Sequence, residues 1–182
     1  MKSIKDMSLG ELAAFICTHL QRNGIDVVLS GGSCVSIYTE NKYASLDLDF
    51  IEFSSVSRRK LKKVLQEIGF YEKNRYFINS ETDIFLEFPS GPPSVGKEPI
   101  KEFIVLNFST GELKILSPTD CVKDRLAAYY HWGDQQSLEQ AVLVAKDDKV
   151  DLDELERWSK VEGKLTAFHE IRKRFEKHLV SL

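Results

Sequence analysis

A short apolar segment that ends in two adjacent glycines constrains the fold of this chain most. Residues 25–30 are apolar and rich in β-branched side chains, which predicts a buried strand. Gly31 and Gly32 follow at once, and Ser33 begins a short helix that we expect to reach about Tyr38. Glycine has no Cβ atom, so backbone N–H groups at this turn can approach a ligand closely. With the positive end of a helix dipole and the Ser33 hydroxyl beside it, this turn is suited to binding phosphate.

A second strand carries two carboxylates on one face. Residues 46–50 read Leu-Asp-Leu-Asp-Phe, and strict alternation places Asp47 and Asp49 on one side of a sheet and Leu48 and Phe50 on the other. Two carboxylates at this spacing suit Mg²⁺, which prefers oxygen ligands and usually binds substrate phosphates as well. A third acid would complete a two-metal site, with its ions about 3.5–4 Å apart, for an in-line phosphoryl displacement.

The third acid is expected on the strand over residues 83–88. Alternation there puts Asp83, Phe85 and Glu87 on one face, and Glu87 is our candidate third ligand with Asp83 as its competitor. Each motif alone has a simpler interpretation, since a glycine pair is often only a tight turn and an isolated D-x-D is often a solvated strand face. The order of strand, glycine turn, helix, D-x-D strand and later acid favours the functional interpretation.

The other elements follow from local signals. Ser8 and Glu11 form a capping box for a helix that ends at Asn23-Gly24. A helix is predicted over 57–68, strands over 70–78, 83–88, 103–108 and 113–116, and a loop over 89–96. Ser117-Pro118 opens a series of helices at about 118–130, 134–146, 151–159 and 163–179. We therefore predict an α/β (α+β) fold, a mixed sheet flanked by helices over residues 1–116 and a C-terminal helical bundle over residues 117–182.

Composition excludes several classes of protein. With 182 residues, 42% hydrophobic, and a formal charge of -3, the chain is not expected to be disordered or to hold nucleic acid through its overall field. Its three cysteines lack a zinc-site or disulfide pattern, and no segment has the length of a membrane span, so a cytoplasmic protein with no membrane partner is expected. The basic run over 58–63 is interpreted as a solvated helix face, with contact to nucleic acid as the alternative. Cys34 is interpreted as a core residue, and His131 and His169 have no metal-ligand spacing.

The order of these motifs resembles the nucleotidyltransferase superfamily, whose signature is a glycine pair with Ser or Thr, a D-x-D or D-x-E strand, and a later single acid. Residues 29–33, 42–50 and 85–88 carry the match, which extends over roughly 27–145. The segment Lys-Tyr-Ala-Ser-Leu-Asp-Leu-Asp-Phe is similar to that of AbiEii-type and MenT-type enzymes of bacterial toxin–antitoxin and phage-defence systems. Those enzymes also have a later helix with a lysine, followed by an Asp, for which Lys123 and Asp134 are the candidates here. The chain departs from the pattern at Lys42, where Arg is usual, and at Gly133, where a basic residue is usual.

The resemblance implies an activity and a site. Asp47, Asp49 and Glu87 would act as catalytic residues and metal ligands for Mg²⁺, or Mn²⁺ in its place, while Gly31, Gly32, Ser33, Lys42, Lys123 and Asp134 would bind the nucleotide. The substrate would be an NTP, and its NMP would pass to a hydroxyl of RNA, such as a tRNA, or of a protein. An antitoxin protein would be a further partner. Two alternatives remain open: an inactive nucleotide-binding or partner-binding module of the same fold, and a metal-dependent phosphohydrolase.

Overall fold

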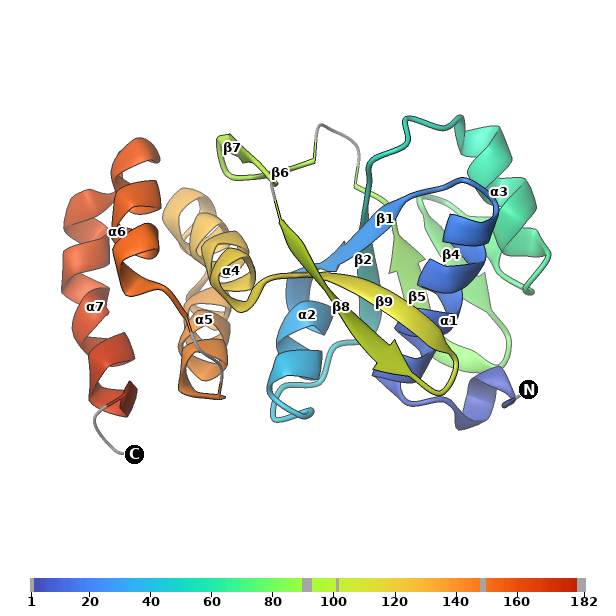
Figure 1. Cartoon of the computed structure of the whole chain (residues 1–182), viewed down its shortest axis with the longest axis horizontal. Coiled ribbons are helices and arrows are strands. Elements are labelled where there is room, and N and C mark those ends of the chain that lie inside the picture. Colours follow the sequence, from blue (N-terminus) through green and yellow to red (C-terminus); the bar gives the residue numbers. More distant parts are fainter. Residues whose placement is uncertain (1, 90–92, 101, 148–149, 180–182) are drawn as a thin grey trace.

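A seven-stranded mixed sheet lies at the centre of the molecule (Figure 1). The computed structural model describes residues 2–89, 93–100, 102–147 and 150–179, and of residues 147 and 176–179 only the backbone is described. Strand order in the sheet is β3-β4-β5-β2-β1-β9-β8. The strands are β1 (Val27–Ser30), β2 (Asp47–Glu52), β3 (Tyr71–Lys73), β4 (Tyr76–Asn79), β5 (Thr82–Glu87), β8 (Phe103–Phe108) and β9 (Gly111–Leu116). A separate hairpin is formed by β6 (Ser94–Val95) and β7 (Glu98–Pro99).

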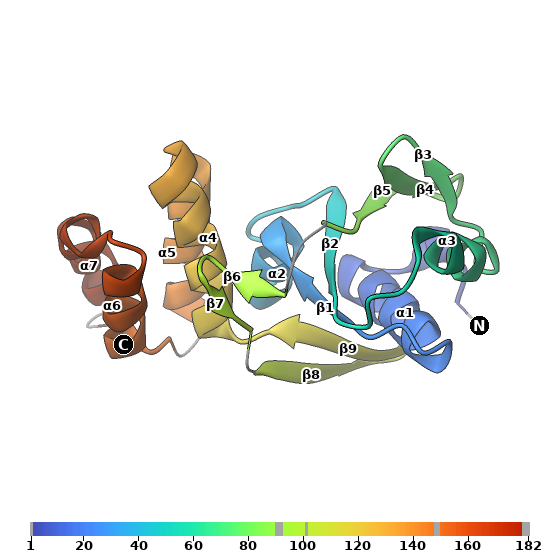
Figure 2. The ribbon, with the colours of Figure 1, turned by 90° about the horizontal axis from the view of Figure 1, so that it is seen from above.

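Helices flank the sheet and then continue alone to the C-terminal end. A short 3-10 helix (Ile4–Asp6) precedes α1 (Leu9–Arg22), α2 (Gly31–Tyr38) and α3 (Arg58–Gln66), and β9 is followed by α4 (Pro118–Trp132), α5 (Gln135–Asp147), α6 (Leu152–Val161) and α7 (Leu165–Leu179). Figure 2 shows α1 and α3 at one end of the molecule, α6 and α7 at the other, and α4 and α5 between α2 and the last two helices. The predicted fold class, a mixed sheet with flanking helices and a helical C-terminal part, is confirmed. Among the described residues, no helix is long and apolar enough to cross a membrane.

The central position of β1 explains its composition. It pairs with β2 in antiparallel and with β9 in parallel orientation, and all four of its residues are buried. A strand that is covered on both faces is mostly apolar, as residues 27–29 are, and the buried Ser30 hydroxyl donates to the Asp49 backbone carbonyl. On one side it is covered by α1. The predicted capping box of this helix is present: the Ser8 hydroxyl accepts from the Glu11 backbone N–H, and the Glu11 carboxylate accepts from the Ser8 backbone N–H. Leu12, Ile16 and Leu20 form the buried face of that helix.

Two sequence predictions of local structure are wrong. Residues 70–78 do not form one strand, because Asn74 takes a left-handed conformation (φ 59°) and turns the chain between β3 and β4. Asn adopts this conformation more readily than most residues. The predicted loop over 89–96 contains β6, while residues 90–92 of it lie outside the described part of the chain. A distant contact stabilises that hairpin, since the Trp158 indole N–H donates to the Val95 carbonyl over 3.3 Å.

Candidate active site

The glycine turn lies directly against one of the two paired carboxylates. Ser30, the last residue of β1, is the register partner of Asp49 on β2, so the turn that follows β1 begins beside that acid. Gly31 has a φ of +69°, and a Cβ atom built on it would collide with the Asp49 carboxylate. At Gly32, a Cβ atom would lie 3.3 Å from the Tyr43 ring. The close approach of backbone to carboxylate therefore requires glycine at residue 31 both for conformation and for space.

The register of the sheet selects the third acid. β2 and β5 are parallel neighbours, and Asp49 pairs with Glu87 while Asp47 pairs with Phe85. Asp83 precedes the paired residues and is exposed. Glu87 is thus the acid of β5 that lies beside the D-x-D pair, and its carboxylate also contacts the Arg75 guanidinium at 3.4 Å.

Two serines hold the strand that carries the acids. The Ser45 hydroxyl donates to the Asp47 carboxylate, and the Ser45 backbone N–H donates to the Ser36 hydroxyl of α2 over 3.0 Å. The Ser33 hydroxyl donates to the Asp47 backbone carbonyl and is fully buried. Ser33 therefore ties α2 to β2 in this structure, and its role in binding the nucleotide stays a prediction. Ser45 is a site residue whose role the sequence reasoning missed, although it stands inside the D-x-D segment.

Asp49 is held in an environment that disfavours its charge. Burial raises its pKa to about 7 from an ordinary 3.8, and the negative charges of Asp47, Glu87 and Asp124 act in the same direction. The Arg125 guanidinium opposes them. None of the described residues donates a hydrogen bond to the Asp49 carboxylate or forms an ion pair with it. A partly buried carboxylate without a donor, beside two other acids, is a group that a cation would stabilise.

Arg125 and Asp124, which lie on α4, are near enough to Asp49 for their charges to act on it. The sequence points to the lysine two residues earlier and does not identify them. Arg125 is largely buried, binds the Asp124 carboxylate at 2.5 and 2.9 Å, and donates to the Gln140 side chain of α5 over 3.3 Å. Burial alone would lower the Arg125 pKa, but the charges of Asp124 and of Asp49 keep it above its ordinary value. The helical period places Lys123 and Arg125 on different sides of α4, yet only the packing of the helix decides which side faces the acids.

Lys123 and Asp134, two of the other predicted nucleotide-binding residues, have partners within the helical part of the chain. The Lys123 ammonium contacts Asp120 at 2.9 Å and Glu154 at 2.7 Å. Asp134 caps α5, since its carboxylate accepts from the backbone N–H groups of residues 136 and 137 and from the Ser137 hydroxyl. Lys42 is exposed in the loop before β2. The nucleotide-binding roles of these three residues stay predictions.

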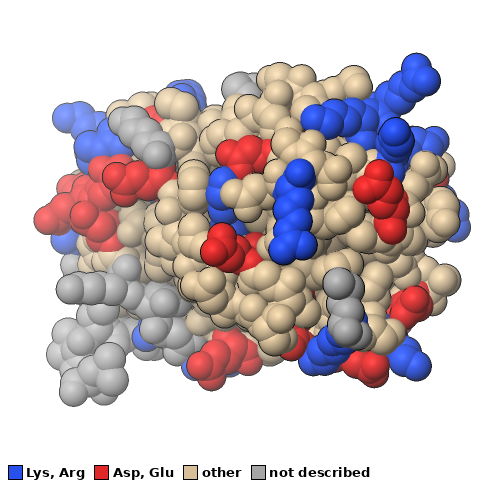
Figure 3. Space-filling model, turned by 45° about the vertical axis from the view of Figure 1, so that its right-hand side comes forward, with Lys and Arg blue, Asp and Glu red and all other residues tan. Residues whose placement is uncertain are grey.

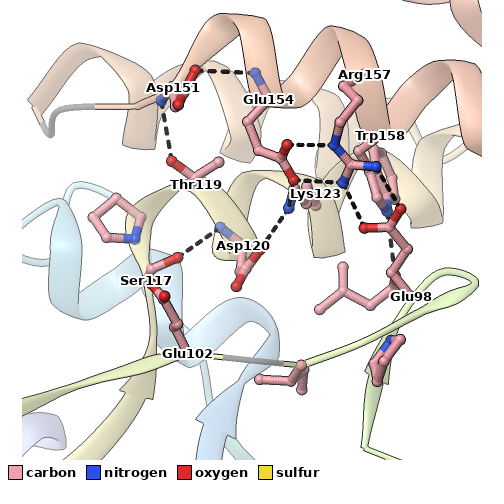
Figure 4. A pocket seen from close by; sticks show the side chains of 14 residues that line it. Glu98, Glu102, Ser117, Thr119, Asp120, Lys123, Asp151, Glu154, Arg157 and Trp158 are labelled. Carbon is pink, nitrogen blue, oxygen red and sulfur yellow. Dashed lines mark hydrogen bonds and ion pairs between the residues drawn. The ribbon is translucent and has the colours of Figure 1, made fainter.

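Two pockets border α4 from different sides. The larger one, of about 530 Å³, is lined by Lys123, Glu98, Glu154, Arg157 and Trp158, and Figure 4 shows how their charged groups point to one another. Neither pocket is lined by any of the three candidate acids, so size alone does not identify the catalytic site. The smaller one, of about 440 Å³, includes Asp124 and Arg125, the two helix residues whose charges act on Asp49. Of these two pockets, the smaller one is therefore the one whose lining charges act on Asp49.

The donor set fits a divalent cation that is shared with a substrate. Within the described residues, no group of three or more His, Cys, Asp or Glu side chains is arranged so that it could hold a metal ion by itself. Mg²⁺ does not require one, because it is usually held by one or two carboxylates together with substrate phosphates. Asp47 and Asp49 on one face of β2 supply that number, and Asp49 offers an oxygen that no donor from the described part of the chain occupies.

The basic run of α3 forms an exposed face at a different place. Basic side chains gather at the upper right of Figure 3, the part of the molecule in which α3 lies. Arg58 and Lys62 of this run both pair with Glu72, at 2.9 and 3.4 Å. All three cysteines are buried, and burial raises the pKa of the Cys34 thiol, which agrees with its interpretation as a core residue. His131 and His169 pair with Glu162 and Glu156, respectively.

Comparison with known proteins shows the fold class. No protein-family model matches the sequence, and no curated protein is similar to it in sequence. A nucleotidyltransferase-like antigenic protein from Paracoccidioides brasiliensis matches in structure, with a TM-score of 0.56 and 16% identity over 75% of each chain. The antibiotic-resistance factor ANT(2'')-Ia matches in its solution structure, with a TM-score of 0.51 and 14% identity over 96% of this chain and 97% of its own. A crystal structure of ANT(2'')-Ia in complex with adenylyl-2''-tobramycin gives a TM-score of 0.49 and 14% identity, over 85% of this chain and 93% of its own. The fold of this protein is thus nucleotidyltransferase-like.

Proposed function

We propose that this protein is a nucleotidyltransferase that moves a nucleoside monophosphate from an NTP to a hydroxyl acceptor. The contact between the Gly31 turn and Asp49, with Glu87 at the adjacent position of β5, is the observation that carries the proposal. It combines a backbone turn suited to phosphate with acids suited to a divalent cation. The nucleotidyltransferase-like fold and the order of the sequence motifs support it.

The protein would act mainly by positioning and by charge. The acceptor oxygen forms a bond to the α-phosphorus as the bond from that phosphorus to the oxygen bridging toward the β-phosphorus breaks, and pyrophosphate leaves. Glu87 takes the proton of the acceptor hydroxyl. The backbone N–H groups at Gly31 and Gly32 orient the phosphates, and Arg125 supplies positive charge from α4. Mg²⁺, or Mn²⁺ in its place, held by Asp47 and Asp49 with Glu87, would neutralise charge on the phosphates and the transferred group.

The first test is metal-dependent binding. Calorimetry with each NTP, in the presence and absence of MgCl₂, should detect binding that requires the metal and is lost in Asp49→Asn. Asp83→Asn, which changes an exposed acid on the neighbouring strand β5, is the matched control and should bind as the unmodified protein does. Binding without any need for metal would contradict the enzyme and favour a nucleotide-binding module.

The second test identifies the acceptor. NTPs labelled at the α-phosphate are incubated with the protein and with one of three acceptors: cellular RNA, extract protein or tobramycin. Tobramycin is included because ANT(2'')-Ia has been crystallised with adenylyl-2''-tobramycin. Label on one of them names the acceptor class. A control with label on the γ-phosphate separates transfer from hydrolysis, because release of inorganic phosphate alone, with no transfer, would identify a phosphohydrolase.

We propose in addition that the protein is a cytoplasmic component of a toxin–antitoxin or phage-defence system of the AbiEii or MenT type. The similarity of residues 42–50 to those enzymes supports this assignment. Induced expression in bacteria should then arrest growth, Asp47→Ala should relieve the arrest, and co-expression of an antitoxin encoded beside it should do the same. Unaffected growth at a verified expression level would contradict a toxin.

A further inference from the structure

The two edge strands of the central sheet differ in length and in charge. β3, at one edge, has three residues, and two of them, Glu72 and Lys73, are charged. β8, at the other edge, has six residues, Phe-Ile-Val-Leu-Asn-Phe, and none of them is charged. Proteins usually protect an exposed edge from pairing with another strand by making it short, charged, bulged or covered. β3 is both short and charged, whereas β8 is neither.

The outer edge of β8 is also neither bulged nor covered. Its register with β9 runs without a shift from Phe103, opposite Leu116, to Phe108, opposite Gly111. Figure 2 shows β8 along one side of the molecule, with β9 on its inner side. None of the six residues is buried, and no second strand pairs with β8 within the part of the chain that the structure describes.

The backbone of β8 directs the N–H and C=O groups of alternate residues to this open edge. On β9, the Glu112 N–H donates to the Thr18 hydroxyl over 2.8 Å, and the Glu112 carbonyl accepts from the same hydroxyl over 3.1 Å, so both groups point away from β8. Asn107 is the register partner of Glu112, and its own N–H and C=O therefore point away from β9. Because the pattern repeats at every second residue, Val105 and Phe103 are oriented in the same way.

These outward groups define one register for a second copy of the strand. In an antiparallel pair, opposed residues lie on the same face, and hydrogen bonds form where outward-directed groups oppose one another. Both conditions hold when Val105 opposes Val105 of the second copy, because Phe103 then opposes Asn107 on each side of the two-fold axis. On the other face Ile104 opposes Leu106, and both are half-buried apolar residues. Within the strand, no charge meets a like charge.

We propose that β8 pairs with β8 of a second copy of this chain, which forms a two-fold dimer with one continuous sheet. The lack of charge favours a second copy, since a charged partner strand would find no opposite charge on β8, whereas β8 itself is an uncharged strand of matching length and register. Each copy uses the same residues, so the contact closes at two copies. The dimer does not depend on the proposed nucleotidyl transfer.

Sedimentation equilibrium of the full chain over a series of concentrations tests the association. We expect monomer and dimer with no larger species, and a dissociation constant in the micromolar range, because two six-residue strands form a small interface. Monomer alone at every concentration up to about 1 mM would overturn the proposal. Growth into larger species would overturn it as well, since a contact between identical edges cannot extend beyond two copies.

Charge at residue 105 tests the register. Val105 is 45% exposed, and Val105→Lys or Val105→Glu places two like charges opposite each other at the two-fold axis, so each variant alone should associate about 10-fold more weakly or less. An equimolar mixture of the two variants should regain association, because the opposed charges then differ in sign. Tyr71→Lys, at an exposed residue of the other edge strand, is the matched control and should associate as the unmodified protein does.

Far-UV circular dichroism at a concentration where only monomer is present checks that every variant is folded. Undiminished association of Val105→Lys, or its loss in Tyr71→Lys, would place the contact elsewhere and overturn the proposal. A mixture of folded Val105→Lys and Val105→Glu that stays monomeric would do the same, because the two-fold register requires these residues to meet.

Discussion

Replacement of Asp49 by asparagine should stabilise the metal-free protein at neutral and alkaline pH. The carboxylate is partly buried near Asp47, Glu87 and Asp124, and its pKa is raised to about 7 from an ordinary 3.8. A difference of this size corresponds to about 4 kcal/mol of free energy that opposes the ionised form in the folded state. The asparagine side chain would occupy nearly the same volume without the charge, so the variant would escape that cost.

The direction of the pH dependence follows from linkage. Because the folded-state pKa is higher than the unfolded one, the folded protein binds more protons, and the stability that this group contributes is complete below pH 3.8 and is lost as pH rises through about 7. The gain from Asp49→Asn should therefore be below about 1 kcal/mol at pH 4 and approach about 4 kcal/mol at pH 8. For a chain of this length, each kcal/mol moves Tm by about 2–4 °C, so the difference in Tm should be at least several degrees at pH 8.

The assay is thermal and urea unfolding of three proteins in chelator-treated buffers from pH 4 to pH 8. Asp83→Asn is the matched control, because this acid stands exposed on β5, and its difference from the unmodified protein should stay constant with pH. Added MgCl₂ should stabilise the unmodified protein at pH 8 and leave Asp49→Asn unchanged. A stability difference between Asp49→Asn and the unmodified protein that is the same at pH 4 and pH 8 would refute the electrostatic reasoning.

Three further predictions concern the turn, the serine beside Asp47, and the helix α4. Gly163→Ala should cost roughly 1 kcal/mol of stability in urea unfolding, because residue 163 has a positive φ. Gly31→Ala should cost clearly more, because residue 31 also has a positive φ and its new Cβ atom would collide with the Asp49 carboxylate. Equal losses would show that the contact with Asp49 is unimportant. Ser45→Ala should weaken Mg-dependent NTP binding by about 10- to 100-fold in a calorimetric titration, because it removes the hydrogen bond to the Asp47 carboxylate. Ser80→Ala, which changes an exposed serine in the turn before β5, is the control and should bind as the unmodified protein does. Lys123→Met should cost up to about 3 kcal/mol of stability with NTP affinity retained, since it leaves Asp120 without this cation whereas Glu154 keeps its pair with Arg157. Arg125→Gln should reduce NTP affinity. If Lys123→Met lowers NTP affinity and Arg125→Gln does not, Lys123 has the phosphate-binding role that the sequence resemblance implies.

The elements of the site that lie close together in the chain could be predicted from the sequence. Alternation over residues 46–50 puts both acids on one strand face, and in the structure Leu48 and Phe50 are indeed fully buried on the other. The glycine pair after a buried strand predicts the turn into α2, which begins at Gly31. These features depend on one strand or one turn, whose geometry is set by steric limits on neighbouring residues.

Only the tertiary structure decided which distant residues meet. Asp83 and Glu87 are equivalent in the alternation of β5, and the parallel register with β2 is what places Glu87 beside Asp49. Lys123 and Arg125 are both basic residues of one helix, and the packing of α4 against α5 and α6 turns one toward the acids and the other into a separate ion-pair network. Parallel pairing and helix packing join segments with no local sequence signal of their partner, because the contacts form between side chains many residues apart.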